Sequence, residues 1–283
     1  MIDKVCLVTG ATAGIGAVTA RELARMGATV VGVSRNPDKC ATVGERVKTE
    51  TGNPQVEFLS ADLSSQAQVR RLAEAFKHKY DRLDALVNNA GAYYFTRQEC
   101  VDGIELTFAL NHLGYFLLTN LLLDLIKASA PARIVNVSSN AHHVAKINFA
   151  DPEGRRRYSG WAAYGQSKLA NLLFTYELAR RLEGTGVTAN ALHPGFVASS
   201  FAQNNGWLVA WGTKFAQKLA GRTPEEGART VIYLATSPEV EGVTGKYFVD
   251  EKAVASSPAS YDVAVAKRLW GVSEQMTGLQ AVA

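Results

Sequence analysis

Short runs of β-branched and aliphatic residues alternate along the chain with longer stretches in which apolar positions recur every three or four residues. The short runs predict strands, and the longer stretches predict amphipathic helices. The strand runs cover 5–10, 29–34, 55–60, 85–90, 133–139 and 187–195, with a further one expected at 245–249. The clearest helical stretches cover 65–80 and 168–183.

This alternation predicts βαβ units, and the continuous apolar character of the strand runs is typical of strands buried on both faces of a parallel sheet. We therefore expect the α/β class, with a Rossmann-type, doubly wound, mostly seven-stranded parallel sheet flanked by helices. No composition break, fixed-period repeat or Pro/Ser-rich linker divides the chain. Residues 1–283 are expected to form a single domain.

Composition and charge exclude several classes of function. A net charge of +4, from 30 basic and 26 acidic residues, is too small to indicate a nucleic-acid surface. The longest apolar run, at 118–126, contains Asn120 and Asp124 and is too short to span a bilayer. No targeting segment precedes the first strand run, so we expect no integral membrane segment and a cytoplasmic location.

The cysteines predict neither a disulfide framework nor a zinc site. Cys6, Cys40 and Cys100 are odd in number, far apart and without metal-like spacing, which suits a reducing compartment. The adjacent His142 and His143 have no patterned acidic or cysteine partner. We interpret both as plain loop residues and expect no metal.

A glycine-rich turn follows the first strand run. The sequence TGATAGIG contains Gly10, Gly14 and Gly16 and leads directly into a helical stretch. A strand, a glycine turn and a helix form a context in which backbone N–H groups can hold a pyrophosphate, although such turns also serve as plain connections. Its position after the first strand favours dinucleotide binding.

The end of the second strand run indicates which dinucleotide is bound. The sequence VSRNPDK has Ser34 and Arg35 at the tip and no acidic residue before Asp38. An acidic side chain there would bind the ribose 2′-hydroxyl of NAD, whereas an arginine suits the 2′-phosphate of NADP. A surface arginine in a turn is the alternative. The pattern favours NADP (NADPH) over NAD.

The sequence AAYGQSK places Tyr164 and Lys168 four residues apart in an otherwise apolar stretch. On a helix this spacing puts both side chains on one face. The pair is also common by chance on helices, with the ring packed against the lysine stem. Its neighbours along the chain decide between these interpretations.

Six short motifs occur in a fixed order along the chain. They are TGATAGIG (9–16), NNAG (88–91), NHLG (111–114), VSS (137–139), YGQSK (164–168) and HPG (193–195). Together they resemble the short-chain dehydrogenase/reductase family. The longer strings LNHLGYFLLTNLLL and RIVNVSSNAHH are similar to the branch that contains retinol dehydrogenases and protochlorophyllide-reductase-like proteins, and the similarity extends nearly end to end.

The resemblance implies an oxidoreductase with four catalytic residues. Tyr164 would exchange a proton with the substrate oxygen, and a Lys168 ammonium nearby would lower the phenol pKa, which is about 10 in a free tyrosine. Ser139 would hydrogen-bond the same oxygen; Ser138 is its competitor, on the opposite face of the strand. Asn111 would anchor a water on a proton route to the lysine, its alternative being a polar residue that caps or kinks a buried helix.

The resemblance also implies the dinucleotide contacts. Asp62 would bind the adenine amino group, with a helix N-cap role as its alternative. Ala17 stands where many NADP-using relatives have a basic side chain, so the NADP prediction depends on Arg35. Ser199 keeps a hydroxyl where a threonine is usual. The implied cofactor-binding residues are Gly10, Thr12, Gly14, Ile15, Gly16, Ser34, Arg35, Asp62, Leu63, Asn89, Ala90, Gly91, Tyr164, Lys168, Pro194, Gly195, Val197 and Ser199.

The single dinucleotide-binding catalytic domain would then carry a substrate lid at 196–221 and a C-terminal extension at 250–283. The lid holds aromatic residues that could cover an apolar carbonyl or alcohol substrate or could pack on the domain: Phe196, Phe201, Trp207, Trp211 and Phe215. The polar 141–161 loop is expected at the rim of the active site.

The family resemblance adds a homo-oligomer as an expectation. Two alternative functions are a carbon–carbon double-bond reductase of the protochlorophyllide-reductase type and a non-catalytic NADP-binding regulator.

Overall fold

The structure is a computed structural model that describes residues 1–196 and 222–279. The described strands form one sheet in the order β3-β2-β1-β4-β5-β6-β7-β8, in which only the β7–β8 pair is antiparallel. The strands are β1 (Val5–Thr9), β2 (Thr29–Ser34), β3 (Val56–Ser60), β4 (Ala85–Asn88), β5 (Ala132–Val137), β6 (Val187–His193), β7 (Tyr247–Val249) and β8 (Lys252–Val254). The α/β class and the parallel core of the sheet are confirmed.

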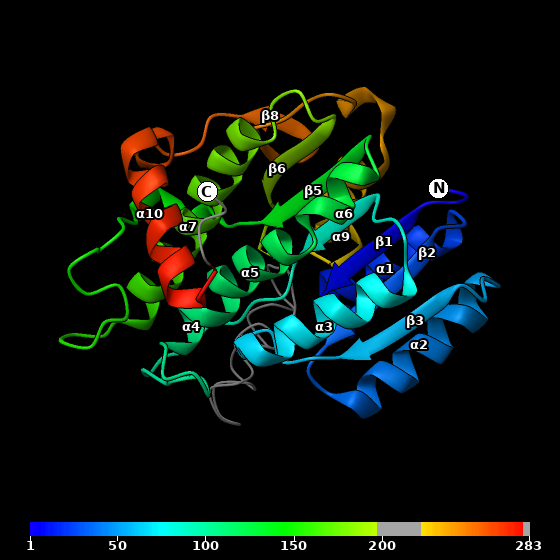
Figure 1. The fold of residues 1–283 in the computed structure, drawn as a ribbon, viewed down its shortest axis with the longest axis horizontal. Coiled ribbons are helices and arrows are strands. Elements are labelled where there is room, and N and C mark those ends of the chain that lie inside the picture. The colour runs from blue at the N-terminus through cyan, green and yellow to red at the C-terminus, as the bar shows by residue number, and fades with distance from the viewer. Residues whose placement is uncertain (197–221, 280–283) are drawn as a thin grey trace.

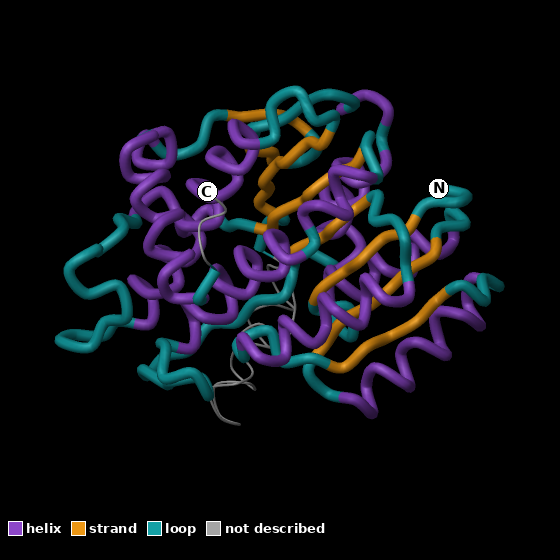
Figure 2. The backbone as a smooth tube through the Cα atoms, viewed as in Figure 1, coloured by secondary structure: helices purple, strands orange, loops and turns teal. Residues whose placement is uncertain are grey.

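Helices lie on both sides of this sheet (Figures 1 and 2). The helices are α1 (Gly14–Arg25), α2 (Pro37–Thr51), α3 (Gln66–Lys79), α4 (Leu106–Phe108), α5 (Gly114–Leu121), α6 (Leu123–Ala128), α7 (Gly160–Arg181), α9 (Pro224–Thr236) and α10 (Val263–Thr277). Shorter turns are the π-helical η1 (Ala109–Leu113) and the 3₁₀ segments η2 (Asn140–Val144), η4 (Pro238–Val240) and η5 (Pro258–Tyr261). Within the described residues, no helix combines the length and the apolar character that a bilayer crossing requires.

The core has two layers because side chains alternate along the buried strands. Leu7 and Val31 face α3, α5 and α7, whereas Cys6 and Val30 face α1, α2 and α9. Strands with both faces covered have no polar side to show, which explains their continuous apolar runs.

The described sheet has eight strands where about seven were expected. The added strand, β8, follows a two-residue turn in which Asp250 and Glu251 both have positive φ, 50° and 63°. Such turns normally carry Asn-Gly or Asp-Gly, and all three residues of β8 are exposed. Neither the turn nor the strand therefore has the pattern by which a sequence reveals a hairpin.

The strand order reverses between β1 and β4. From β1 the chain adds β2 and then β3 toward one edge of the sheet. It then returns to pair β4 with the other side of β1, and β5 follows toward the opposite edge. In open α/β sheets, ligands bind beyond the carboxyl ends of the strands at such a switch point. The glycine turn after β1 and the NNAG motif after β4 therefore meet at the place where a dinucleotide is expected.

Candidate active site

Tyr164 and Lys168 lie one turn apart on α7, which begins at Gly160 and so includes both residues. Both side chains are buried, with 8% and 3% of their surface exposed. The lysine Nζ lies 5.7 Å from the centre of the Tyr164 ring and donates a 3.1 Å hydrogen bond to the Val137 carbonyl at the end of β5. The helix thus presents the pair side by side against the carboxyl edge of the sheet.

Burial controls the ionisation of this pair. It raises the pKa of the Tyr164 phenol to about 12, and a hydrogen bond with Ser139 acts in the opposite direction. It also lowers the pKa of the Lys168 ammonium to about 7. Desolvation is therefore the largest influence on the pKa of both groups, whereas the sequence predicted a phenol pKa lowered by the lysine.

Ser138 and Ser139 differ in what they contact. The Ser138 hydroxyl is buried and donates to the Lys168 carbonyl at 2.8 Å, so it supports the helix backbone. Ser139 lies at the N-cap of η2, where its hydroxyl accepts from the Ala141 N–H at 3.3 Å and meets the Tyr164 phenol. The second serine is therefore the one that shares a site with the tyrosine, as the motif predicted.

Asn111 is fully buried in the π-helical turn η1, a helix irregularity that recurs at functional sites. Its amide accepts from the Ala92 N–H at 2.9 Å and donates to the Ala92 carbonyl at 3.0 Å and to the Ser167 hydroxyl at 3.1 Å. A Cβ built on Gly91 would lie 3.2 Å from Asn111 Oδ1 and 3.5 Å from Lys168 Nζ. The asparagine and the lysine thus face the same narrow space, and the water-anchoring role stays a prediction.

The glycine turn fits the close approach of an anionic ligand. Gly10 and Gly14 have positive φ, and a Cβ on Gly16 would lie 2.3 Å from the Gly10 carbonyl oxygen. Helix α1 starts at Gly14 after Ala13, which provides no side-chain cap. The first N–H groups of α1, which include that of Ile15, therefore point from the helix start to the place where a pyrophosphate would lie.

The residues at the ends of β2 and β3 border the same edge. Thr12 and Ser34 join the glycine turn to β2 through a 2.7 Å hydroxyl contact. Arg35 is exposed, and its guanidinium acts on the buried Tyr94 phenol, opposing the rise in pKa that burial causes there. Asp62 Oδ1 accepts from the Ser64 N–H at 2.9 Å and the Ser64 hydroxyl at 2.7 Å, so this carboxylate also shapes the turn before α3.

The NNAG motif braces the glycine turn. Asn89 Nδ2 donates to the Thr9 carbonyl at 2.7 Å, while the N–H groups of Asn89 and Ala90 donate to the Thr9 hydroxyl at 2.8 and 3.0 Å. Leu63, next to Asp62, is buried, and its carbonyl lies 2.6 Å from where a Cβ on Gly114 would sit. These residues hold the edge together, and their dinucleotide contacts stay predictions.

Part of the predicted nicotinamide side can be described. Gly195 follows Pro194 with a φ of 85°, and a Cβ there would lie 2.6 Å from Arg222 Cδ. Phe196 is 63% exposed. Val197, Ser199 and the predicted lid from 197 to 221 lie outside the described residues.

Three aromatic side chains near Tyr164 were not singled out from the sequence. The Tyr93 ring meets the Tyr164 ring edge-on with centres 5.8 Å apart, and Phe95 meets Tyr93 at 4.9 Å. The Trp161 ring lies 6.4 Å from that of Tyr164. A Cβ on Gly160 would lie 2.3 Å from the Tyr94 carbonyl oxygen, so only glycine lets the 93–95 segment pack this closely against α7.

Phe95 and Trp161 are 49% and 56% exposed, an uncommon state for large apolar side chains gathered in one place. We call Tyr93, Phe95 and Trp161 the aromatic mouth. Their positions in the sequence were the available signal: Tyr93 and Phe95 lie two and four residues after the NNAG motif, and Trp161 lies about one helical turn before Tyr164.

The long loop before α7 folds back onto the helix. Gln166 accepts from the Asn148 N–H at 2.8 Å and donates to the Pro152 carbonyl at 2.8 Å. Tyr158 donates to the Tyr94 carbonyl and to the buried Glu105 carboxylate, both at 3.2 Å. The loop is thus fixed to α7 two residues from Tyr164, and to the segment that carries the aromatic mouth.

The two adjacent histidines have different environments. His143 is exposed, as expected for a loop residue, but His142 is fully buried. The expectation that both are plain loop residues is wrong for His142, because η2 turns its ring inward against Tyr247, with ring centres 5.0 Å apart.

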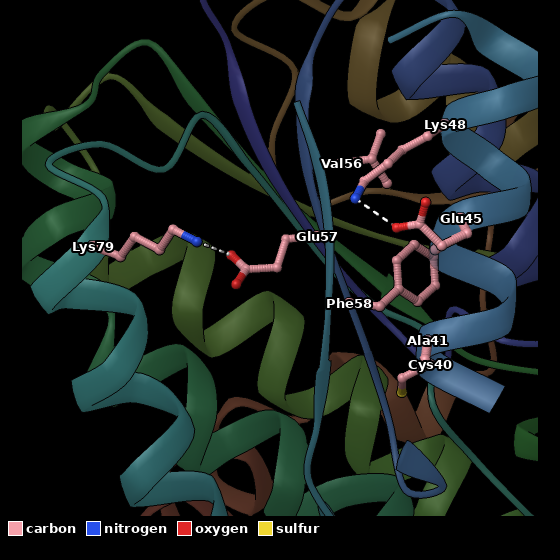
Figure 3. Close-up of a pocket in the computed structure, with 9 residues that line it drawn as sticks. Cys40, Ala41, Glu45, Lys48, Val56, Glu57, Phe58 and Lys79 are labelled. Carbon is pink, nitrogen blue, oxygen red and sulfur yellow. Dashed lines mark hydrogen bonds and ion pairs between the residues drawn. The ribbon is translucent and has the colours of Figure 1, made fainter. Parts of the chain in front are cut away.

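An open cleft of about 320 Å³ lies elsewhere, between α2 and the edge strand β3 (Figure 3). Ion pairs of 2.7 Å join Lys48 to Glu45 and Lys79 to Glu57 at its rim. The cleft is lined by none of the predicted site residues: it is bounded by Cys40, Ala41, Gly44, Glu45, Lys48, Val56, Glu57, Phe58 and Lys79. Its charged groups already pair with one another, so we assign it no role in the chemistry.

Comparison with known proteins adds a family to this geometry. The family model described as short chain dehydrogenase matches residues 4–206. The chain is 45% identical to human polyprenol dehydrogenase and 44% identical to mouse retinol dehydrogenase 12, covering 98% of this chain and 86% and 87% of theirs.

Solved structures give the same result. A crystal structure of an uncharacterised protein from Mycobacterium paratuberculosis superposes with a TM-score of 0.79 at 36% identity, covering 98% of this chain and 94% of that one. The NADP active-site complex of RhlG from Pseudomonas aeruginosa superposes with a TM-score of 0.69 at 31% identity, covering 88% of this chain and 94% of that one.

Proposed function

Because the chain belongs to the short-chain dehydrogenase family, we propose that it is an NADP-dependent oxidoreductase acting on the carbonyl or alcohol group of an apolar substrate, such as a retinal-like or other aldehyde or ketone. The family and the dehydrogenases among its relatives support a nicotinamide-dependent oxidoreductase of CH–OH and C=O groups. The observation that carries the proposal is the meeting of Ser139 and Tyr164 beside Lys168.

Each polar group of the site has a place in this chemistry. The nicotinamide, when bound, supplies or accepts the hydride. Ser139 hydrogen-bonds the substrate oxygen, and Tyr164 gives that oxygen a proton in reduction or takes one in oxidation. Lys168, held through the Val137 carbonyl, favours the phenolate electrostatically when it is charged. Asn111 anchors the water that connects Lys168 to solvent for proton exchange.

Two observations support NADP as the cofactor. The tip of β2 bears Ser34 and Arg35 and has no acidic side chain to repel a 2′-phosphate. The similar RhlG structure is an NADP complex. The uncapped start of α1 and the glycine turn suit the pyrophosphate that NAD and NADP share.

The aromatic mouth supports an apolar substrate. The rings of Tyr93 and Trp161 lie beside that of Tyr164, and Phe95 packs on Tyr93. The half-exposed Phe95 and Trp161 rings gain free energy when they cover an apolar body. The relatives named retinol and polyprenol dehydrogenase carry names of apolar alcohols. Both points favour a bulky hydrocarbon beside the reacting oxygen.

The test is NADPH oxidation against a series of aldehydes and ketones of increasing apolar size, retinal included, for the natural chain and for Tyr164→Phe. We expect kcat/KM to rise with apolar size in the natural chain. Tyr164→Phe should keep its NADPH affinity but lose carbonyl reduction by about 100-fold or more, since it lacks the acid. Full reductase activity in this variant, or reduction of a conjugated C=C bond alone, would overturn the proposal.

A further inference from the structure

His142 links the predicted catalytic serine to the C-terminal extension. Its backbone N–H and its ring Nδ1 both reach the Ser139 carbonyl oxygen, at 3.1 and 2.6 Å. On the other side of the ring, Nε2 lies 3.1 Å from the Ser257 N–H. One fully buried side chain therefore bridges two backbone groups that are 118 positions apart in the sequence, 257 minus 139.

The contacts determine the protonation state of this ring. A backbone N–H can only donate, so Nε2 must accept and carries no proton. A neutral imidazole then has its proton on Nδ1, where it donates to the Ser139 carbonyl. Burial favours the neutral form and lowers the pKa of His142 to about 4.

The group on the far side of the ring is itself held firmly. The Ser257 carbonyl accepts from the Ser260 hydroxyl at 2.6 Å, and the Ser256 hydroxyl contacts those of Ser260 and Tyr176 at 2.6 and 2.7 Å. Since Tyr176 belongs to α7, the same helix that carries Tyr164 anchors the donor that orients His142.

We propose that His142, fixed as its neutral Nδ1–H tautomer by the Ser257 N–H, is a positioning residue that holds Ser139 in the orientation needed to share the substrate oxygen with Tyr164. This inference rests on the proposed function. Beyond β5 the backbone of Ser139 continues into the short turn η2, and among the described residues both hydrogen bonds to its carbonyl come from His142. Rotation of that peptide would swing the hydroxyl away from the phenol.

The expected consequence is kinetic. A displacement of about 1 Å of a positioned group can lower a rate by about 100-fold, so the reactive step suffers while binding does not. Replacement of the ring by one without nitrogen should lower kcat by at least about tenfold. The KM of the carbonyl compound and the Kd of NADPH should change by less than about twofold, because His142 contacts neither the aromatic mouth nor the glycine turn.

Three variants separate this role from plain packing. His142→Phe keeps a ring against Tyr247 but removes both hydrogen bonds. His142→Gln returns one donor and one acceptor and should recover about fivefold or more of the lost kcat. His143→Phe is the matched control, because the His143 ring is exposed and its centre lies 4.0 Å from that of the His142 ring. A kcat for His142→Phe within twofold of the natural chain, or no recovery in His142→Gln, would overturn the proposal.

Two spectroscopic measurements on the intact protein do not depend on turnover. The ¹⁵N signals of His142 should identify Nε2 as the unprotonated nitrogen, and the ¹³Cζ signal of Tyr164 should move in His142→Phe but not in His143→Phe. The opposite tautomer, or an unmoved Tyr164 signal, counts against the proposal. If the natural chain reduces no carbonyl compound, the proposed function fails while these two signals still decide the role of His142.

Discussion

At the scale of single residues, the site is defined by buried polar groups whose ionisation is set by desolvation. Lys168 has a pKa lowered to about 7, and the cause is burial rather than a neighbouring charge. Its ammonium reaches the Val137 carbonyl and the face of the Tyr115 ring, 5.8 Å from the ring centre. Such a lysine is useful for acid–base chemistry and costly for folding.

Lys168→Met should therefore raise stability near neutral pH. Between the ordinary lysine pKa of 10.5 and the folded pKa of about 7, the unfolded chain binds a proton that the folded chain does not, so stability falls as the pH falls through this window. Removal of the amine should add on the order of 4 kcal/mol to the unfolding free energy at pH 7, and almost nothing above pH 10.5.

Urea unfolding of the two proteins from pH 6 to 10.5 tests this. The gain should shrink steadily as the pH rises, and Lys252→Met, at an exposed position, should show no such trend. An equal effect of Lys168→Met at every pH would mean that packing, not the charge, sets the change.

Arg35→Asp should reverse the dinucleotide preference. The change removes the planar cation at the tip of β2 and places there the acidic group that binds a ribose 2′-hydroxyl. The ratio of kcat/KM for NADPH to that for NADH should fall by about 100-fold. Arg46→Asp, on the exposed side of α2, is the control and should leave the ratio unchanged; an unchanged ratio for Arg35→Asp would show that this residue does not read the phosphate.

The choice of Ser139 over Ser138 came from the family resemblance, since strand alternation indicates only that the two hydroxyls point to opposite faces. In the structure the Ser138 hydroxyl bonds the Lys168 carbonyl, and Ser139 meets the Tyr164 phenol. His142 could not be recognised in the same way. Its role depends on Ser257, and no local pattern links a histidine to a backbone N–H so far along the chain. The aromatic mouth was missed for a related reason, since Tyr93 and Trp161 come together at the Tyr164 ring only after folding.

At the scale of elements, α7 and the loop before it form one unit. The loop is tied to the helix through the amide of Gln166, which pairs with the backbone of Asn148 and Pro152. It is also tied to α4 through Tyr158 and the Glu105 carboxylate, which accepts from the Thr107 and Phe108 N–H groups at 2.9 and 2.7 Å. This arrangement supports the prediction that the loop lies at the rim of the site.

Gln166→Leu should release the loop from α7 without disturbing the chemistry. We expect the KM of an apolar carbonyl compound to rise several-fold, while kcat and NADPH affinity change by less than about twofold, because Tyr164 and the glycine turn keep their own contacts. Amide hydrogen exchange should become faster across 145–159. Lys146→Ala, an exposed change in the same loop, is the control; an unaltered KM with faster exchange would place the loop away from the substrate.

The buried strands were easier to predict than the exposed hairpin at the edge of the sheet. β1 to β7 match the apolar runs to within a few residues because burial on both faces leaves an unbroken signal. Helix α7 begins at Gly160, ahead of the clearest apolar stretch at 168–183, where only a glycine fits beside the Tyr94 carbonyl. β8 was missed because the turn at Asp250 and Glu251 is held by tertiary contacts, namely an ion pair to Arg222 and a hydrogen bond from the Glu251 N–H to Thr230.

At the scale of the whole molecule, the described part of the C-terminal extension belongs to the main core. Helix α10 lies alongside α7 (Figure 1), and Trp270 packs against Phe116 and Phe174 with ring centres 4.9 and 5.7 Å apart. The end of α10 also docks on α3, where Arg70 donates to the Thr277 carbonyl at 2.7 Å. The expectation of a single domain agrees with this packing, while the expected homo-oligomer stays a prediction.

Trp270→Ala should therefore weaken the entire fold and not only its C-terminal segment. The side chain is 5% exposed, and the Arg181 guanidinium lies 4.0 Å from its ring centre, so truncation leaves a cavity against α7. Loss of a buried tryptophan costs about 3 kcal/mol or more. Denaturant unfolding, followed by far-ultraviolet circular dichroism, should show one transition at a lower midpoint, and NADPH should shift that midpoint upward in both proteins.

Val263→Ala, at a partly exposed position of the same helix, should change the free energy of unfolding by less than about 0.5 kcal/mol. A separate early transition in Trp270→Ala, with the main one unmoved, would instead mean that α10 folds as an independent appendage and that His142 receives its partner from a segment outside the cooperative unit.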